Sequence, residues 1–134
     1  RRRHTRFRNV TGVQTCALPI YELPVLAARA ALGGRLEVTG AAELRVKESD
    51  RITAVVNGFR TLGVDARELP DGFIVQSGRR PTGGTVNAAG DHRLVMAFTL
   101  VGLGATGPTT ITGAEAVAVS YPRFEADLAS ICQR

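Results

Sequence analysis

The sequence predicts an α/β fold in which helices pack against a mixed sheet. Three observations lead to this prediction. Apolar residues at helical spacing alternate along the chain with short β-rich runs, one segment occurs twice, and one helical segment is apolar on almost every side. The expected order of elements is α-β-α-β-β-β-α-β-α.

The internal repeat relates residues 22–44, ELPVLAARAALGGRLEVTGAAEL, to residues 92–117, HRLVMAFTLVGLGATGPTTITGAEAV. Each copy has an apolar helix-like run, a glycine-rich stop, a β-rich run and then TGAAEL or TGAEAV. A second helix is expected at a matching distance after each copy. We therefore interpret the chain as two copies of one α/β unit, the second of them truncated.

The first two helices have recognisable ends. The first is expected to start near Glu22, to tolerate Pro24 in its first turn, and to stop at Gly33 and Gly34. The second spans about residues 49–62 and stops at the next glycine. Its apolar residues form a single stripe, made of Ile52, Val55, Val56, Phe59 and Leu62.

The later elements follow from similar signals. In residues 64–76, VDARELPDGFIVQ, a Pro-Asp-Gly turn between alternating runs predicts a hairpin, and GGTVNAAG adds a short strand after it. The third helix opens at Asp91, and its apolar residues indicate burial on most sides. The fourth helix is expected to use Ser120 as its cap and to turn three residues inward, Phe124, Leu128 and Ile131.

The net charge of +5 belongs to the start of the chain. Five of the 17 Lys and Arg residues lie in residues 1–20, which contain no acid, so the other 12 balance the 12 acids. This basic segment could be a nucleic-acid arm or a transit peptide. It also resembles a translated sequencing adapter and has no sustained helical amphipathicity. We therefore predict that residues 1–20 are non-native and that residues 21–134 form the body.

Without that segment the only cysteine is Cys132, so neither a disulfide framework nor a metal site is expected. The composition is 44% hydrophobic, and no uninterrupted apolar run approaches the ~18 residues that a membrane span needs. The sequence therefore predicts a cytoplasmic protein.

Charge at two helix starts locates a candidate site. A helix N-terminus favours acids, and a cation there costs about 0.3 to 1 kcal/mol. Asp50 and Asp91 follow this rule, but Arg51, His92 and Arg93 do not. Free backbone N–H groups and guanidinium groups that converge in this way favour an anion, carboxylate or phosphate.

The alternative is that Arg51 and Arg93 form surface salt bridges with their neighbours Asp50 and Asp91, which would contribute little to stability. We favour the anion site because both violations occur at matching helix entries. Lys47 and Glu48 alone would be solvated charges, and His92 alone would be an exposed polar residue. Beside a bound anion, however, the pKa of the Glu48 carboxyl would rise, as a general acid requires.

The segments LRVKESDRI, GDHRLVMAF and VSYPRF together resemble the C-terminal domain of the 3-phosphoshikimate 1-carboxyvinyltransferase family, also called 5-enolpyruvylshikimate-3-phosphate synthases. The resemblance covers residues 21–132. It implies repeated βαβαββ units of the enolpyruvyl transferase inverse barrel fold, with residues 21–134 as part of the C-terminal domain.

The resemblance also implies an activity. Members transfer the enolpyruvyl group of phosphoenolpyruvate to the 5-hydroxyl of shikimate 3-phosphate, without a metal or organic cofactor, in the shikimate pathway to chorismate and the aromatic amino acids. By resemblance Glu48 takes part in proton transfer, Lys47 contacts the shikimate moiety, and Arg51 and Arg93 grip phosphoenolpyruvate, with His92 beside them as a second catalytic candidate.

Two positions depart from the family pattern. Tyr21 stands where the family has an aspartate, and the repeat identifies the same gap because its sister position is Asp91. Val119 stands where some members have a lysine. The N-terminal domain and the start of the C-terminal domain are expected to be missing, so this chain alone should be inactive. The parent enzyme is expected to be monomeric, with no nucleic-acid or membrane partner.

Two other functions remain open. The related transferase that acts on UDP-N-acetylglucosamine shares this fold and chemistry, although VKESDR and DHR favour the shikimate enzyme. A non-enzymatic RNA-binding module would use the basic arm, but the body lacks aromatic residues within a basic stripe.

Overall fold

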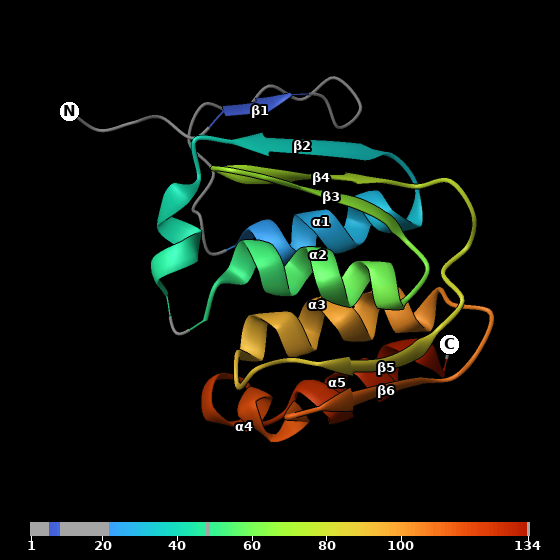
Figure 1. The fold of residues 1–134 in the computed structure, drawn as a ribbon. Coiled ribbons are helices and arrows are strands. Elements are labelled where there is room, and N and C mark those ends of the chain that lie inside the picture. Colours follow the sequence, from blue (N-terminus) through green and yellow to red (C-terminus); the bar gives the residue numbers. More distant parts are fainter. Residues whose placement is uncertain (1–5, 9–21, 48, 134) are drawn as a thin grey trace.

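The computed structural model describes residues 6–8, 22–47 and 49–133. In it, three helices separate two sheets (Figure 1). The helices are α1 (Leu23–Leu32), α2 (Arg51–Thr61) and α3 (His92–Leu103). All three begin at the same end of the molecule, on the left of Figure 1. Their positive N-terminal ends therefore face the same region.

The first sheet is antiparallel and has the strand order β1-β2-β4-β3. Its strands are β1 (Arg6–Arg8), β2 (Arg35–Thr39), β3 (Asp65–Leu69) and β4 (Gly72–Gln76). The hairpin predicted over residues 64–76 is confirmed as β3–β4, with Leu69 paired to Gly72. Gly72 has to be glycine, because a Cβ atom there would overlap the Val38 carbonyl of β2.

The second sheet consists of two parallel strands, β5 (Gly84–Asn87) and β6 (Thr109–Thr112). The expectation of one mixed sheet is therefore wrong for the described residues. Antiparallel β3 and β4 need only a tight turn, whereas parallel β5 and β6 need a crossover, which α3 provides. Because α1, α2 and α3 lie between the two sheets, the sheets do not join (Figure 1).

The repeat is visible in the order of elements. In the first copy, α1, β2, a 3₁₀ helix η2 (Ala42–Val46) and α2 follow one another. In the second copy, α3 and β6 lead to a 3₁₀ helix η3 (Ala114–Ala116), a short α4 (Val117–Ser120) and α5 (Phe124–Cys132). The two leading helices, α1 and α3, pack against each other.

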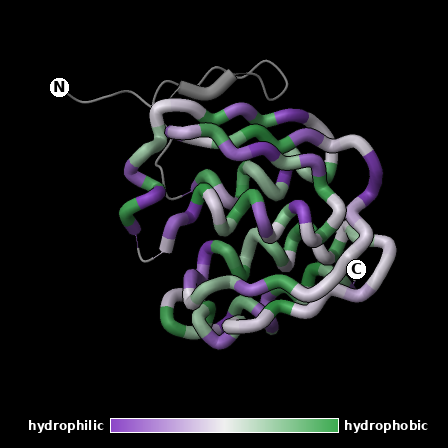
Figure 2. The backbone as a smooth tube through the Cα atoms, viewed as in Figure 1, coloured by the Kyte–Doolittle hydropathy of each residue, from purple (hydrophilic) through white to green (hydrophobic). Residues whose placement is uncertain are grey.

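The predicted helix ends are largely confirmed. The helix α1 has its proline in the first turn and stops at Gly33, and Asp91 is the N-cap of α3. The five apolar residues predicted for the stripe of α2 are all buried. Figure 2 shows hydrophobic residues along the three central helices and an alternation of hydrophilic and hydrophobic residues along β2, β3 and β4.

The prediction for the last helix is wrong in two respects. Ser120 ends α4 instead of capping α5, because a turn through Pro122 separates it from the first residue of α5. Ile131 is 69% exposed, whereas Phe124 and Leu128 are half-buried. No residue of α5 is fully buried, so its apolar stripe covers the surface of α3 only in part.

Candidate active site at the starts of α2 and α3

A buried ion pair joins the starts of α2 and α3. Arg51 is the first residue of α2, and its Nε donates a hydrogen bond to Oδ2 of Asp91, the N-cap of α3. Each of the two side chains is only 1% exposed. A cation at the positive end of a helix is thereby neutralised by an acid from a neighbouring helix, and the two helix starts are held together.

Hydrogen bonds within the loop between β5 and α3 place Asp91 at the start of α3. The backbone N–H of Ala89 donates to Oδ1 of Asn87 at 2.8 Å, and Ala89 itself has a left-handed backbone with φ of 50°. That conformation is uncommon for a residue other than glycine. The backbone N–H of Asp91 then donates to the carbonyl of Ala88 at 2.9 Å. The second carboxylate oxygen of Asp91 accepts from the backbone N–H of Arg93 at 3.0 Å.

A second ion-pair network holds the segment that precedes α2. Arg45, in η2, pairs with Asp50 at 2.9 Å and with Glu68 of β3 at 2.8 Å. It also donates to the carbonyls of Leu69 and Pro70, at 2.7 and 2.9 Å. Arg45 thereby links the N-cap of α2 to the β3–β4 hairpin.

This network lowers the pKa of Asp50. Partial burial alone would raise the pKa, but hydrogen bonds from the backbone N–H of Thr53 and from Arg45 stabilise the ionised carboxylate and outweigh burial. The carboxylates of Glu68 and Asp50 raise the pKa of Arg45 above its usual value. Asp50 is therefore both the cap of α2 and an ionised partner of Arg45.

Sequence reasoning missed Arg45. Its partner Glu68 is far along the chain, and Asp50 lies five residues away beyond a loop, so no helical or strand spacing predicts the network. The only local signal is that Arg45 stands between two apolar residues, Leu44 and Val46, in a segment otherwise rich in charge.

The structure brings most of the predicted site residues to one end of the molecule. Lys47 is half-buried at the end of η2, four positions before Arg51. His92 and Arg93 are half-buried in the first turn of α3. Glu48 lies outside the described residues, so its predicted role stays a prediction.

The alternative of surface salt bridges between sequence neighbours is wrong. Asp50 pairs with Arg45, and Asp91 pairs with the buried Arg51. Asp50 and Arg51 pair with other residues because adjacent side chains at a helix start do not face each other. The helix α1 differs from α2 and α3 because no side chain caps its start. Tyr21, its sister to Asp91, also lies outside the described residues.

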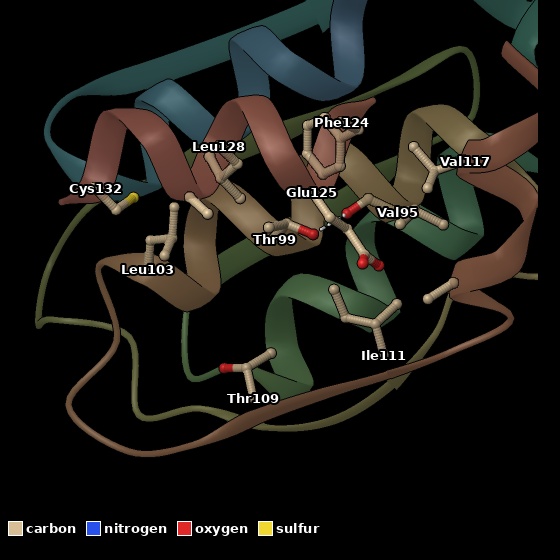
Figure 3. A pocket seen from close by; sticks show the side chains of 12 residues that line it. Val95, Thr99, Leu103, Thr109, Ile111, Val117, Phe124, Glu125, Leu128 and Cys132 are labelled. Atoms are coloured by element: carbon tan, nitrogen blue, oxygen red, sulfur yellow. Dashed lines mark hydrogen bonds between the residues drawn. The ribbon is translucent and has the colours of Figure 1, made fainter. Parts of the chain in front are cut away.

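An apolar pocket of about 370 Å³ lies elsewhere, between α3, β6 and α5 (Figure 3). None of the predicted site residues lines it. Its walls are mainly aliphatic and aromatic side chains, with Thr99, Thr109, Glu125 and Cys132 as the polar groups. Because its one charged group is a carboxylate, the pocket does not suit an anionic substrate.

In residues 6–8, 22–47 and 49–133, no group of three or more His, Cys, Asp or Glu side chains is arranged to hold a metal ion. Within the same residues, no helix has both the length and the apolar character for a membrane crossing.

Comparison with known proteins identifies the family. The family model for EPSP synthase (3-phosphoshikimate 1-carboxyvinyltransferase) matches residues 3–128. The chain belongs to the EPSP synthase family. The family match begins inside the segment predicted to be non-native, so the boundary at residue 20 stays a prediction.

Individual EPSP synthases agree with this assignment. The chain is 48% identical over 115 residues to the 3-phosphoshikimate 1-carboxyvinyltransferase of Carboxydothermus hydrogenoformans, and 42% identical over 135 residues to that of a Roseiflexus species. These alignments cover 85% and 98% of this chain but only 27% and 31% of the relatives. The chain thus spans about a quarter to a third of the length of these EPSP synthases.

A solved EPSP synthase has the same fold over this region. The structure from Acinetobacter baumannii superposes with a TM-score of 0.74 at 42% sequence identity. The superposition covers 78% of this chain and 25% of that one. The predicted α/β fold of a partial enolpyruvyl transferase domain is therefore confirmed.

Proposed function

We propose that this chain is the substrate-gripping part of an enzyme that transfers the enolpyruvyl group from phosphoenolpyruvate to the 5-hydroxyl of shikimate 3-phosphate. Membership of the EPSP synthase family is the observation that carries the proposal. Arg51, His92 and Arg93 lie at neighbouring helix starts, and Lys47 follows η2 just before α2. This gathering of charges supports the proposal, because phosphoenolpyruvate is a small polyanion.

Each residue has a proposed role. Arg51 and Arg93 hold the anionic groups of phosphoenolpyruvate, and Lys47 contacts the shikimate moiety. Glu48 delivers a proton to the methylene carbon, with His92 beside it. The 5-hydroxyl oxygen adds to C2 and gives its proton to the aspartate that the family has at the position of Tyr21. In the second step Glu48 takes a proton back from the new methyl group as the C2–O bond to phosphate breaks. Inorganic phosphate and the enolpyruvyl ether are the products.

The proposed setting of the reaction follows from the same family. The reaction proceeds without a metal or organic cofactor, in the cytoplasm, as a step of aromatic amino acid biosynthesis in the shikimate pathway. The parent enzyme works as a monomer and uses neither nucleic acid nor a membrane.

A chimeric enzyme tests the proposed activity. Residues 22–133 would replace the matched stretch of the Carboxydothermus hydrogenoformans relative, so that the host supplies the residue at position 21. We expect phosphate release that requires both phosphoenolpyruvate and shikimate 3-phosphate. In this chimera Glu48→Gln should lower kcat by about 10²-fold or more, the usual contribution of a general acid.

The control is Glu43→Gln, which makes the same chemical change at an exposed acid of η2 and should leave kcat unchanged. A folded chimera that releases no phosphate with both substrates would contradict the proposal. Turnover only with UDP-N-acetylglucosamine as acceptor would favour the related transferase instead.

A further inference from the structure

We propose that Asp91 is the positioning residue of this anion site, acting through Arg51; the inference rests on the proposed function. Asp91 uses its two carboxylate oxygens for different helices. Oδ2 accepts from Nε of Arg51 at the start of α2, and Oδ1 accepts from the backbone N–H of Arg93 in α3. One carboxylate therefore contacts both residues proposed to bind phosphoenolpyruvate, Arg51 through its side chain and Arg93 through its backbone.

The pairing through Nε has a geometric consequence. A guanidinium group is planar and rigid, so holding its Nε–H fixes both the plane of the group and the direction of its terminal nitrogens. A side chain that is already ordered loses less conformational entropy when an anion binds. Asp91 thus prepares Arg51 for a ligand without having to touch that ligand itself.

A comparison with Asp50 separates this role from helix capping. Asp50 and Asp91 occupy the same N-cap position, and each accepts a backbone hydrogen bond within its own helix. The Asp50 side chain is 39% exposed and pairs with Arg45, whereas that of Asp91 is 1% exposed and pairs with Arg51. Because Asp50 caps its helix while only partly buried, capping alone does not require the full burial of Asp91.

The experiment uses the full 134-residue chain with ¹⁵N-labelled arginine, titrated with phosphoenolpyruvate and observed by NMR. Asp91→Asn keeps a good N-cap but removes the negative charge that Nε of Arg51 contacts. We expect phosphoenolpyruvate to bind about ten- to a hundredfold more weakly to this variant, because the guanidinium group of Arg51 would no longer be held in place. The Nε–H signal of Arg51 should also exchange faster with water.

Two further variants make the result specific. Asp50→Asn is the same chemical change at the cap of α2 and should alter the affinity less than about twofold. If Asp91 acts through Arg51, adding Asp91→Asn to Arg51→Lys should weaken binding no further than Arg51→Lys does alone, because the two effects are not additive.

Removing one partner of a buried ion pair can unfold a protein, so Asp91→Glu provides a second variant that retains the charge. Its extra methylene prevents the carboxylate from serving both helices in the same geometry, and the same loss of affinity is expected.

Equal affinities in the unsubstituted chain and either Asp91 variant would overturn the inference, as would additive losses in the double variant. The absence of any phosphoenolpyruvate-induced shift of Arg51 in the unsubstituted chain would also overturn it. That outcome would leave the turnover test of the chimera, and with it the proposed function, standing.

Discussion

At the scale of residues, the two cap aspartates show how the same local chemistry leads to different roles. Both were predicted from the rule that acids favour helix starts, and both do cap their helices. Their cationic partners were not predictable, because Arg45 reaches Asp50 across a loop and Arg51 reaches Asp91 from a different helix. Charges at helix starts therefore located the candidate site, but only the tertiary structure pairs them.

The lowered pKa of Asp50 predicts a specific dependence of stability on pH. A carboxyl group whose pKa is lower in the folded than in the unfolded chain stabilises the fold above the unfolded value, here 3.8. That contribution is lost as the pH falls through the lower, folded value. In Asp50→Asn the free energy of unfolding should therefore fall less steeply on acidification below about pH 4.

Urea denaturation at a series of acidic pH values would measure this slope. The Asn side chain still caps α2, so the helix itself should persist in the variant, as circular dichroism can verify. Identical slopes for the variant and the unsubstituted chain would show that Asp50 does not contribute to acid lability.

At the scale of elements, the pattern of apolar residues predicted most helices and strands correctly. It succeeded for α2 because a single stripe packs against one layer, and for α3 because apolar residues all round correspond to burial on most sides. It failed at α5, where helical spacing does not reveal whether a neighbour covers the apolar face. The division into two sheets was also missed, since strand patterns do not identify the partner of each strand.

The contact between α2 and α3 depends on a glycine in the middle of a helix. Alanine is normally preferred there by about 1 kcal/mol. A Cβ atom at Gly58 would, however, overlap the ring of Phe98, which is fully buried in α3. Overpacking typically costs about 1 to 3 kcal/mol, so Gly58→Ala should lower the free energy of unfolding by about 1 kcal/mol net.

Asn57→Ala provides the matched control, since it lies next to Gly58 on the exposed side of the same helix. There alanine should raise the free energy of unfolding by about 0.5 kcal/mol through helix propensity alone. Chemical denaturation measures both values. A Gly58→Ala variant as stable as Asn57→Ala would mean that Phe98 moves aside without cost.

At the scale of the whole molecule, the described residues form a well-packed core with a candidate site at one end. The core continues from the first sheet through α1 and α2 to α3, and it includes the edge-to-face pair of Phe59 and Phe98, with centroids 5.9 Å apart. The candidate site lies at the end of this core where α2 and α3 begin, with Arg51 buried and Lys47, His92 and Arg93 half-buried.

This arrangement leads to the expectation that the 134-residue chain alone has no transferase activity. Proximity of both substrates supplies a large part of catalysis, and this chain aligns with only 27% of a relative such as that of Carboxydothermus hydrogenoformans. A phosphate-release assay with the purified chain, phosphoenolpyruvate and shikimate 3-phosphate should remain at background. The active chimera described above serves as the positive control, and release that depends on both substrates would contradict the expectation.

The Arg51–Asp91 pair also bears on how the two repeats can change over evolutionary time. A duplication produces two interchangeable copies, and interchangeable copies can drift independently. Here the first copy supplies Arg51, the first residue of α2, and the second copy supplies Asp91, the N-cap of α3. An uncharged residue at either position would remove one partner of a buried ion pair, which is strongly destabilising. Lineages should therefore replace both residues together or keep both, and the two copies can no longer exchange places.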